Sequence, residues 1–237
     1  MILRRVIDHF RKQEWTAIAI DFLIVVIGVF VGIQAANLND ARGEERLGDE
    51  YLRAFREDLL ADSKMLSAEI ELRQKQLSDA KTVLEYFDGR ALEVDRFFNA
   101  YYSAIYSHRM QPSRNTMDEV LNSGNLRLVR NAKIRNGLLD LYAAYEIIAL
   151  TENHIARDFD KYLYDTTFTS VPFRLEQEWE NNAANQAIAK TLLGNLTVEN
   201  GFRLTSVNLQ FAERGLIADL TAARRRVETL LEQLPSQ

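Results

Sequence analysis

The sequence predicts an all-α protein, in which one N-terminal transmembrane helix is followed by an up-and-down bundle of long antiparallel helices. Residues 16–36 are almost entirely apolar. The chain has only 3 Pro and 10 Gly in 237 residues, too few for the many tight turns of a β-sandwich. Apolar residues also recur every three or four positions over long stretches, which is the spacing of one buried helix face.

The composition excludes several classes of function. With 47% hydrophobic and 27% charged residues, the chain is typical of folded proteins. The net charge is −5 and no basic stripe follows a predicted helix, so we expect no nucleic-acid partner. The exception is the run Arg224-Arg225-Arg226 in an otherwise acidic C-terminal helix. The absence of Cys excludes disulfides and thiolate chemistry.

We expect residues 16–36 to form the transmembrane helix. Asp21 is the only charged residue among them, and at this length a helix spans roughly 30 Å, the thickness of the hydrocarbon core of a bilayer. Trp15 stands at the start, where an interfacial aromatic belongs. A cleaved signal peptide would have a shorter apolar region and a better cleavage site than Ile33-Gln34-Ala35. A core helix of a soluble protein rarely runs this long without polar residues.

The flanking charges predict the orientation of this helix. Residues 1–15 carry four basic side chains, Arg4, Arg5, Arg11 and Lys12, whereas acidic residues dominate the fifteen positions after the span. The positive-inside rule therefore places the N-terminus in the cytoplasm, as a short amphipathic stub on the inner leaflet. Residues 37–237 are then extracytoplasmic, which means the periplasmic side of the inner membrane in a Gram-negative bacterium.

One face of the span carries a pattern for helix association. Gly28, Gly32 and Ala36 are spaced by four residues, and such small residues let two helix backbones approach closely in lipid. Asp21 falls on nearly the same face, and carboxylates within a membrane usually find a partner. We therefore expect a helix contact there. The alternative is that the glycine spacing arises by chance and that Asp21 lies near enough to the headgroups to stay hydrated.

Beyond the span, we expect a helix over residues 44–86, continuous with the span except for a possible interruption at Gly43. Asp88-Gly89 ends this helix, and a second helix covers residues 92–106. An irregular stretch, residues 107–131, contains Pro112. A short helix should begin there at a capping box formed by Thr116 and Glu119 and should end at a left-handed Gly124. Asn131 can then cap the next helix.

The remaining chain predicts three more helices. The first covers residues 132–168, with Glu152 as the one polar residue on its apolar face, and Val171-Pro172 ends it. The second covers residues 174–193 and is followed by a break at Gly194 or Gly201. The last covers residues 203–233. Its expected apolar face consists of Leu204, Val207, Phe211, Leu216, Leu220, Val227, Leu231 and Leu234.

Two patches resemble an uncharacterised bacterial membrane family, the domain of unknown function 6090. The first is the span and its exit, which contain Gly28, Gly32, Asn37, Asn39, Ala41 and Arg42. The second is the run Ser123, Gly124, Asn125, Leu126, Arg127 and Leu128. Leu38 stands where the family usually has Trp. The resemblance implies one membrane anchor followed by a helical domain, and it implies no activity.

The polar residues around Gly124 form a candidate docking or anion-binding loop. The set is Arg114, Asn122, Gly124, Asn125, Arg127 and Arg130. Alternatively, these side chains cap helix ends and fix the connection across the bundle. A ligand cavity could be lined by the aromatic side chains within the range 97–106 together with Tyr142 and Tyr145. At helical spacing, however, such side chains more often form the core.

The sequence contains no recognisable catalytic or metal-binding motif. His154 and Asp158 share a helix face, but two ligands do not make a metal site. We therefore expect no enzyme activity, metal or cofactor. The hypothesis that follows is a structural, assembly or accessory role in the membrane, with a second copy or an envelope protein as partner. The alternative is a ligand-sensing ectodomain that signals through a partner protein.

Overall fold

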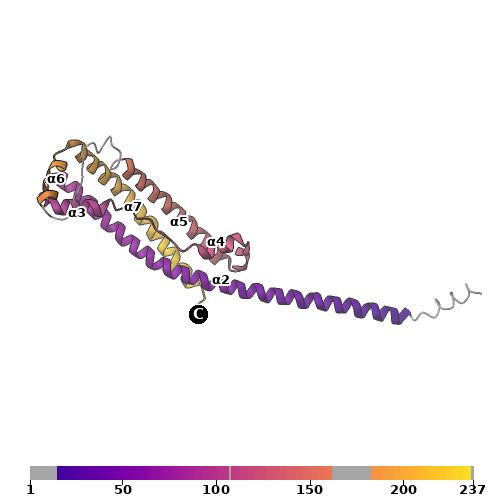
Figure 1. Cartoon of the computed structure of the whole chain (residues 1–237). Coiled ribbons are helices and arrows are strands. Elements are labelled where there is room, and N and C mark those ends of the chain that lie inside the picture. Colours follow the sequence, from indigo (N-terminus) through magenta and orange to yellow (C-terminus); the bar gives the residue numbers. More distant parts are fainter. Residues whose placement is uncertain (1–14, 107, 162–182, 236–237) are drawn as a thin grey trace, which may run out of the picture. The chain divides into compact units, whose positions relative to one another are not determined.

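The structure, a computed structural model, describes residues 15–106, 108–161 and 183–235. It divides into two compact units, Met1–Glu50 and Tyr51–Gln237. The described residues form helices joined by short connecting segments, with no strand, and the all-α class is confirmed (Figure 1). The elements are α2 (Trp15–Phe87), α3 (Val94–Ala104), α4 (Asn115–Asn122), the 3₁₀-helix η1 (Asn125–Leu128), α5 (Ala132–Phe159), α6 (Ala183–Leu193) and α7 (Leu196–Gln233).

Helix α2 begins in the first unit and supplies the first helix of the second. Gly43 does not interrupt it. The helix ends where the sequence predicts, because Gly89 has a φ of +93°, a left-handed conformation that only glycine adopts easily. The amide of Arg90 then donates to the carbonyl of Glu85 at 3.0 Å, which satisfies one of the last free carbonyls of the helix.

Within the first unit, α2 is long and apolar enough to cross a membrane, which is compatible with membrane anchoring. Its most apolar window is not buried against any other described part of the chain. Large side chains such as Phe22 and Phe30 are exposed over 70% and 60% of their surfaces. A core helix of a soluble protein would bury such side chains, so the described structure does not support that alternative.

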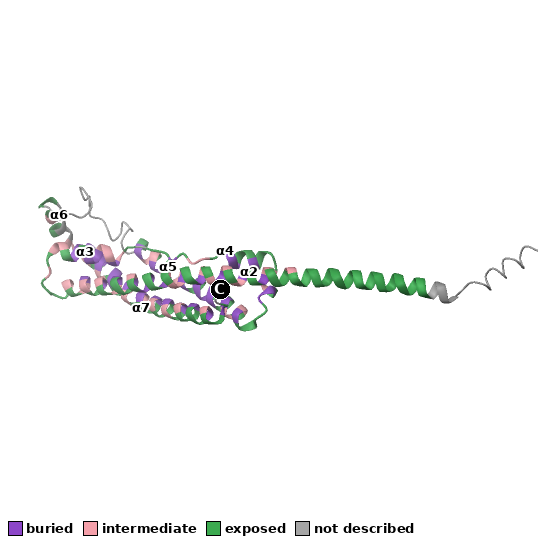
Figure 2. Ribbon diagram, turned by 90° about the horizontal axis from the view of Figure 1, so that it is seen from below, coloured by how far each residue is buried: buried purple, intermediate pink, exposed green. Residues whose placement is uncertain are grey.

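In the second unit, α5 and α7 pack lengthwise, and the part of α2 in this unit is bonded to both of them around one apolar core (Figure 2). Contacts between α2 and α7 join Arg56 to Leu231 and Arg73 to Glu213, so these two helices are antiparallel. Helices α2 and α5 run in the same direction, because α3 and the chain between α3 and α5 lead back along the bundle. The largest fully buried side chains include Phe55, Leu59, Leu66, Leu138, Leu141, Ile148, Leu216 and Leu220.

The aromatic residues of α3 form a second part of the core. Phe97 is fully buried, and its ring lies 4.7 Å from that of Tyr86 and 5.7 Å from that of Phe202. Tyr101 lies 4.3 Å from Phe202. The core interpretation of these aromatics is therefore confirmed, except that Tyr102 is half-buried and Tyr106 is exposed.

The connection between α3 and α5 contains one correct and one wrong cap. Gly124 is left-handed, with a φ of +71°, and Asn131 accepts hydrogen bonds from the amides of Lys133 and Ile134, both as predicted. The capping box is wrong. Helix α4 begins one residue before Thr116, and its N-cap residue, Arg114, makes no side-chain cap bond. Thr116 is buried instead, because the helix turns it toward the core.

The sequence also predicts the wrong face for the first half of α7. Leu204, Val207 and Phe211 are exposed over 37%, 39% and 71% of their surfaces. The buried positions include polar residues: Thr205, Ser206 and Glu213. Thr205 donates to the carbonyl of Gly201 at 2.8 Å and Glu213 accepts from Arg73, so polarity alone does not place such residues outside. The helix also begins at Leu196 rather than at residue 203, and Gly194 rather than Gly201 separates it from α6.

Some predictions lie outside the described residues. These are the stub up to residue 14, the end of the helix predicted over 132–168, the break at Val171-Pro172, and the start of the helix predicted at residue 174.

Candidate functional site

The predicted contact face of the span lies on the exposed first part of α2. A side chain added at Gly28 or Gly32 would meet nothing within 4 Å, so no other described part of the chain covers these two glycines. Asp21 and Ala36 are exposed on the same helix. A contact through this face would therefore have to come from another molecule, and it stays a prediction.

The candidate docking loop is only partly brought together. Asn122, Gly124, Asn125 and Arg127 surround the C-terminal end of α4, whereas Arg114 lies at the other end of that helix.

The printed contacts of this loop favour fixation of the chain. Nδ2 of the Asn125 side chain donates to the hydroxyl of Tyr51 at 3.1 Å, and that hydroxyl donates to Glu119 at 3.1 Å, so the loop is tied to α2. Arg114 pairs with Glu146 of α5. Arg127 and Arg130 are exposed at the surface of this region.

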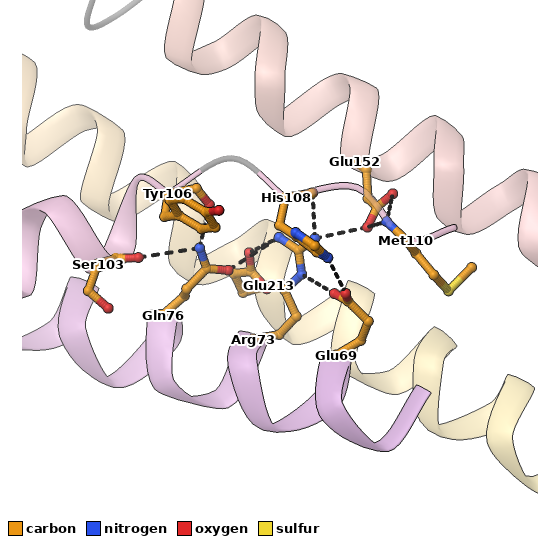
Figure 3. A network of polar contacts seen from close by, with 9 residues as sticks. All are labelled: Glu69, Arg73, Gln76, Ser103, Tyr106, His108, Met110, Glu152 and Glu213. Carbon is orange, nitrogen blue, oxygen red and sulfur yellow. Dashed lines mark hydrogen bonds and ion pairs between the residues drawn. The ribbon is translucent and has the colours of Figure 1, made fainter. Parts of the chain in front are cut away.

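The most distinctive cluster of the structure was missed by the sequence analysis, apart from one of its members. Arg73 of α2 lies in the interior with only 2% of its surface exposed (Figure 3). Three carboxylates surround it: Glu69 of α2, Glu152 of α5 and Glu213 of α7, which are 5%, 6% and 0% exposed. We call these four residues the Arg73 cluster.

The guanidinium of Arg73 serves the three carboxylates unequally. Its Nη2 donates to Oε1 of Glu152 at 2.8 Å, a short charge-assisted bond. Its Nη1 reaches Oε1 of Glu213 only at 3.4 Å, and its Nε lies 3.7 Å from Oε2 of Glu69. Glu152 therefore interacts most strongly with the guanidinium, and the hydrogen bond from Arg73 to Glu213 is the weaker of the two.

The cluster also holds the chain that leads from α3 to α4. We call residues 106 and 108–114 the crossing segment. Nη2 of Arg73 donates to the carbonyl of His108 at 2.8 Å, and the amide of Met110 donates to both oxygens of Glu152 at 3.2 Å. Nearby, Nε2 of Gln76 donates to the carbonyl of Tyr106 at 2.6 Å. Buried side chains thus satisfy the backbone of a segment that has no regular secondary structure.

A second buried carboxylate holds the other end of the crossing segment. Asp62 accepts hydrogen bonds from the amide of Ser113 at 2.9 Å and from the hydroxyl of Tyr145 at 2.8 Å. The hydroxyl of Tyr142 donates to the carbonyl of Ser113 at 2.8 Å. Burial raises the pKa of Asp62, and the bonds from Ser113 and Tyr145 partly oppose that rise. Burial likewise raises the pKa of both tyrosines, so their hydroxyls stay protonated donors.

Burial also changes the pKa of two carboxyl groups in the Arg73 cluster. It raises the pKa of Glu213 from 4.5 to about 7, although the positive charge of Arg73 opposes the shift. It raises the pKa of Glu152 as well, against the amide of Met110 and Arg73. Strongly shifted carboxyl groups gather in functional sites more often than elsewhere. The chemistry that this arrangement offers is the binding and release of protons.

The cluster has one edge toward solvent. His108 is 42% exposed along its side chain, and its Nε2 lies 2.6 Å from Oε1 of Glu69. His154 and Asp158 form a separate surface pair at 3.8 Å. No set of three or more His, Cys, Asp or Glu side chains within the described ranges is arranged to hold a metal ion.

A weak sequence signal for the cluster exists in retrospect. Glu152 interrupts the clearest apolar face of the chain. Arg73 follows the buried Leu66 and Ile70, and Glu213 precedes Leu216, all at spacings of three or four residues. Three charged residues in core register on three helices indicate that their charges meet inside.

The basic run of α7 lines a shallow hollow. Arg225 and Arg226 are joined there by Lys133 of α5, and the hollow has a volume of about 220 Å³. Gly137 and Leu230 also line it, and they pack so closely that a side chain at Gly137 would come within 2.9 Å of Leu230.

The chain matches no family model, no curated protein and no solved structure.

Proposed function

We propose that this protein is a membrane-anchored helical protein with a structural, assembly or accessory role, and that it associates through the face formed by Asp21, Gly28, Gly32 and Ala36. The partner is a second copy of the chain or another envelope protein. The bundle serves as the extracytoplasmic part, on the periplasmic side of a bacterial inner membrane. The resemblance to the domain of unknown function 6090 supports the membrane location.

The observation that carries the proposal is the uncovered small-residue face of α2. Nothing described in the chain lies within 4 Å of a side chain added at Gly28 or Gly32, so packing within the bundle does not account for these glycines. Glycine is unfavourable within a helix by about 1 kcal/mol relative to alanine, and helix contact in lipid is a common reason to retain it. The acidic Asp21 on this face would gain a protonated or hydrogen-bonded partner in such a contact.

The contacts of the Arg73 cluster agree with a structural role for the interior of the bundle. Arg73 and Glu152 are hydrogen-bonded to each other and to the backbone of the crossing segment. These buried charged groups therefore hold the segment in place.

The association is tested with the double substitution Gly28→Leu and Gly32→Leu. Both changes keep the span apolar, so insertion is preserved, but leucine side chains separate the helix backbones. After chemical crosslinking of native membranes, we expect the crosslinked species of the wild type to fall at least several-fold in the variant. The mass of that species identifies a second copy or a different partner.

The matched control is Val26→Leu. With 3.6 residues per turn, Val26 lies on the opposite side of the same helix, so this change enlarges a side chain away from the proposed contact face. It should leave the crosslinked species unchanged. A wild-type chain that yields only monomer, or a double variant that crosslinks as well as the wild type, would contradict the proposed contact face.

A further inference from the structure

We propose that the Arg73 cluster is a proton-binding site, that Glu213 is the group that takes the proton, and that its occupancy sets how firmly the crossing segment is held. This inference concerns the interior of the bundle and is independent of the proposed contact in the membrane.

The Arg73 cluster carries more negative than positive groups. Three carboxylates surround a single guanidinium, and all four groups are buried. Among the described residues, the charged or titratable groups that face Glu213 are Arg73 and Glu69 from α2, Glu152 from α5 and, at the edge beyond Glu69, His108 from the crossing segment. A buried excess of negative charge is costly, and uptake of a proton removes part of it.

The three carboxylates have unequal numbers of hydrogen-bond donors. Glu152 accepts from Arg73 at 2.8 Å and from the backbone amide of Met110 at 3.2 Å. One oxygen of Glu69, Oε1, lies 2.6 Å from Nε2 of His108, although its other oxygen has no hydrogen-bond partner. Glu213 receives only Nη1 of Arg73, at 3.4 Å, and its Oε2 is buried without a hydrogen-bond partner. A carboxylate with few donors gains most from protonation, so the geometry places the proton on Glu213.

The edge of the cluster nearest to solvent is at His108. Its side chain is 42% exposed and contacts Glu69, and an imidazole can accept and pass on protons. The guanidinium of Arg73 lies between Glu69 and Glu213 and keeps its protons at these pH values, so it does not relay a proton. Glu213 therefore exchanges its proton when the interior of the bundle opens to solvent.

The proton is coupled to the crossing segment through Arg73. The same Nη2 atom donates to the carbonyl of His108 and to Glu152, and Glu152 holds the amide of Met110. When Glu213 is neutral, Arg73 can donate its hydrogen bonds to Glu152 and to the carbonyl of His108 in the crossing segment. When Glu213 loses its proton, a third carboxylate competes for the guanidinium, and the bonds that hold the segment weaken.

The direction of the pH dependence follows from the pKa of Glu213, which burial raises from 4.5 to about 7. The folded bundle therefore binds this proton more tightly than the unfolded chain does. Its contribution to stability is fully present below pH 4.5 and is lost as the pH rises through about 7. Glu152 and Asp62, whose pKa values are also raised by burial, contribute with the same sign.

The first test measures thermal unfolding of the full-length protein in detergent micelles between pH 5 and pH 8. We expect the midpoint of the wild type to fall by roughly 5 °C over this range through Glu213. Glu213→Gln imitates the protonated group, so its midpoint should be higher than that of the wild type at pH 8 and should change less with pH. The control is Glu232→Gln, which removes an exposed carboxylate from the same helix and should leave the wild-type profile unchanged.

A second measurement on the wild type needs no folded variant. Carbon NMR of labelled glutamate should show one side-chain carboxyl that titrates near neutral pH, and the Met110 amide should exchange faster above pH 7 than the intrinsic rate increase explains. The proposal is overturned if no glutamate titrates there. It is also overturned if Glu213→Gln fails to fold, or if it lowers the midpoint equally at every pH, because the carboxylate would then be needed as an anion.

Discussion

Replacement of Arg73 by leucine should lower the free energy of unfolding of the bundle by about 3–5 kcal/mol, because it leaves buried carboxylates without their cation. The change removes the hydrogen bonds to Glu152 and Glu213 and the bond to the carbonyl of His108. In the full-length protein in detergent micelles, circular dichroism should show the unfolding midpoint reduced by roughly 10 °C.

One further variant separates the effect of the positive charge from that of the planar guanidinium, and another serves as a control. Arg73→Lys keeps the charge but lacks the planar fork that reaches both α5 and α7, so its midpoint should lie between those of the wild type and Arg73→Leu. Arg96→Leu removes an exposed arginine of α3 and should change the free energy of unfolding by no more than about 0.5 kcal/mol. An Arg73→Leu protein as stable as the Arg96→Leu protein would show that the buried ion pairs contribute nothing to the fold.

Truncation of Phe97 to alanine should lower the free energy of unfolding by about 3–5 kcal/mol, since a fully buried aromatic ring leaves a cavity. The ring of Phe97 lies 5.1 Å from that of Phe98, 5.4 Å from that of Phe87 and 5.7 Å from that of Phe202. These neighbours come from α2, α3 and α7, so the ring joins three elements at one end of the bundle. Thermal unfolding in micelles measures the effect.

The matched control is Phe211→Ala, because Phe211 is likewise a phenylalanine within a helix, α7, but is 71% exposed. It should cost about 0.5 kcal/mol or less. Equal effects of the two substitutions would mean that the aromatic residues of α3 do not form core. They would then line open space, as the cavity interpretation of the sequence requires.

The helices themselves could be predicted from the sequence because their signal is local. The scarcity of Pro and Gly favours long helices. Three further signals act within a few residues and are found in the structure: the turn at Gly89, the left-handed Gly124 and the Asn131 cap. The apolar period of residues 132–159 was equally clear, since Leu138, Leu141 and Ile148 are fully buried.

The buried polar groups could not be placed in the same way, because their partners are distant in the sequence. Arg73 meets Glu152 and Glu213, which lie 79 and 140 positions away. A prediction from the apolar pattern assigns polar side chains to the surface. For this reason the predicted buried face of α7 contained Leu204, Val207 and Phe211, which are exposed in the structure. The capping box failed for a similar reason, since Thr116 is drawn into the core of the folded bundle.

In the proposed topology, the chain crosses the membrane once, with the stub on one side and the bundle on the other. Because the chain contains no Cys, each introduced cysteine is its only thiol. Lys64→Cys places the thiol at an exposed site of α2 within the bundle, and His9→Cys places it in the stub. With a membrane-impermeant maleimide on intact spheroplasts, Lys64→Cys should be labelled at once and His9→Cys only after lysis. Labelling of both before lysis, of neither, or of His9→Cys alone would contradict the proposed anchor and its orientation.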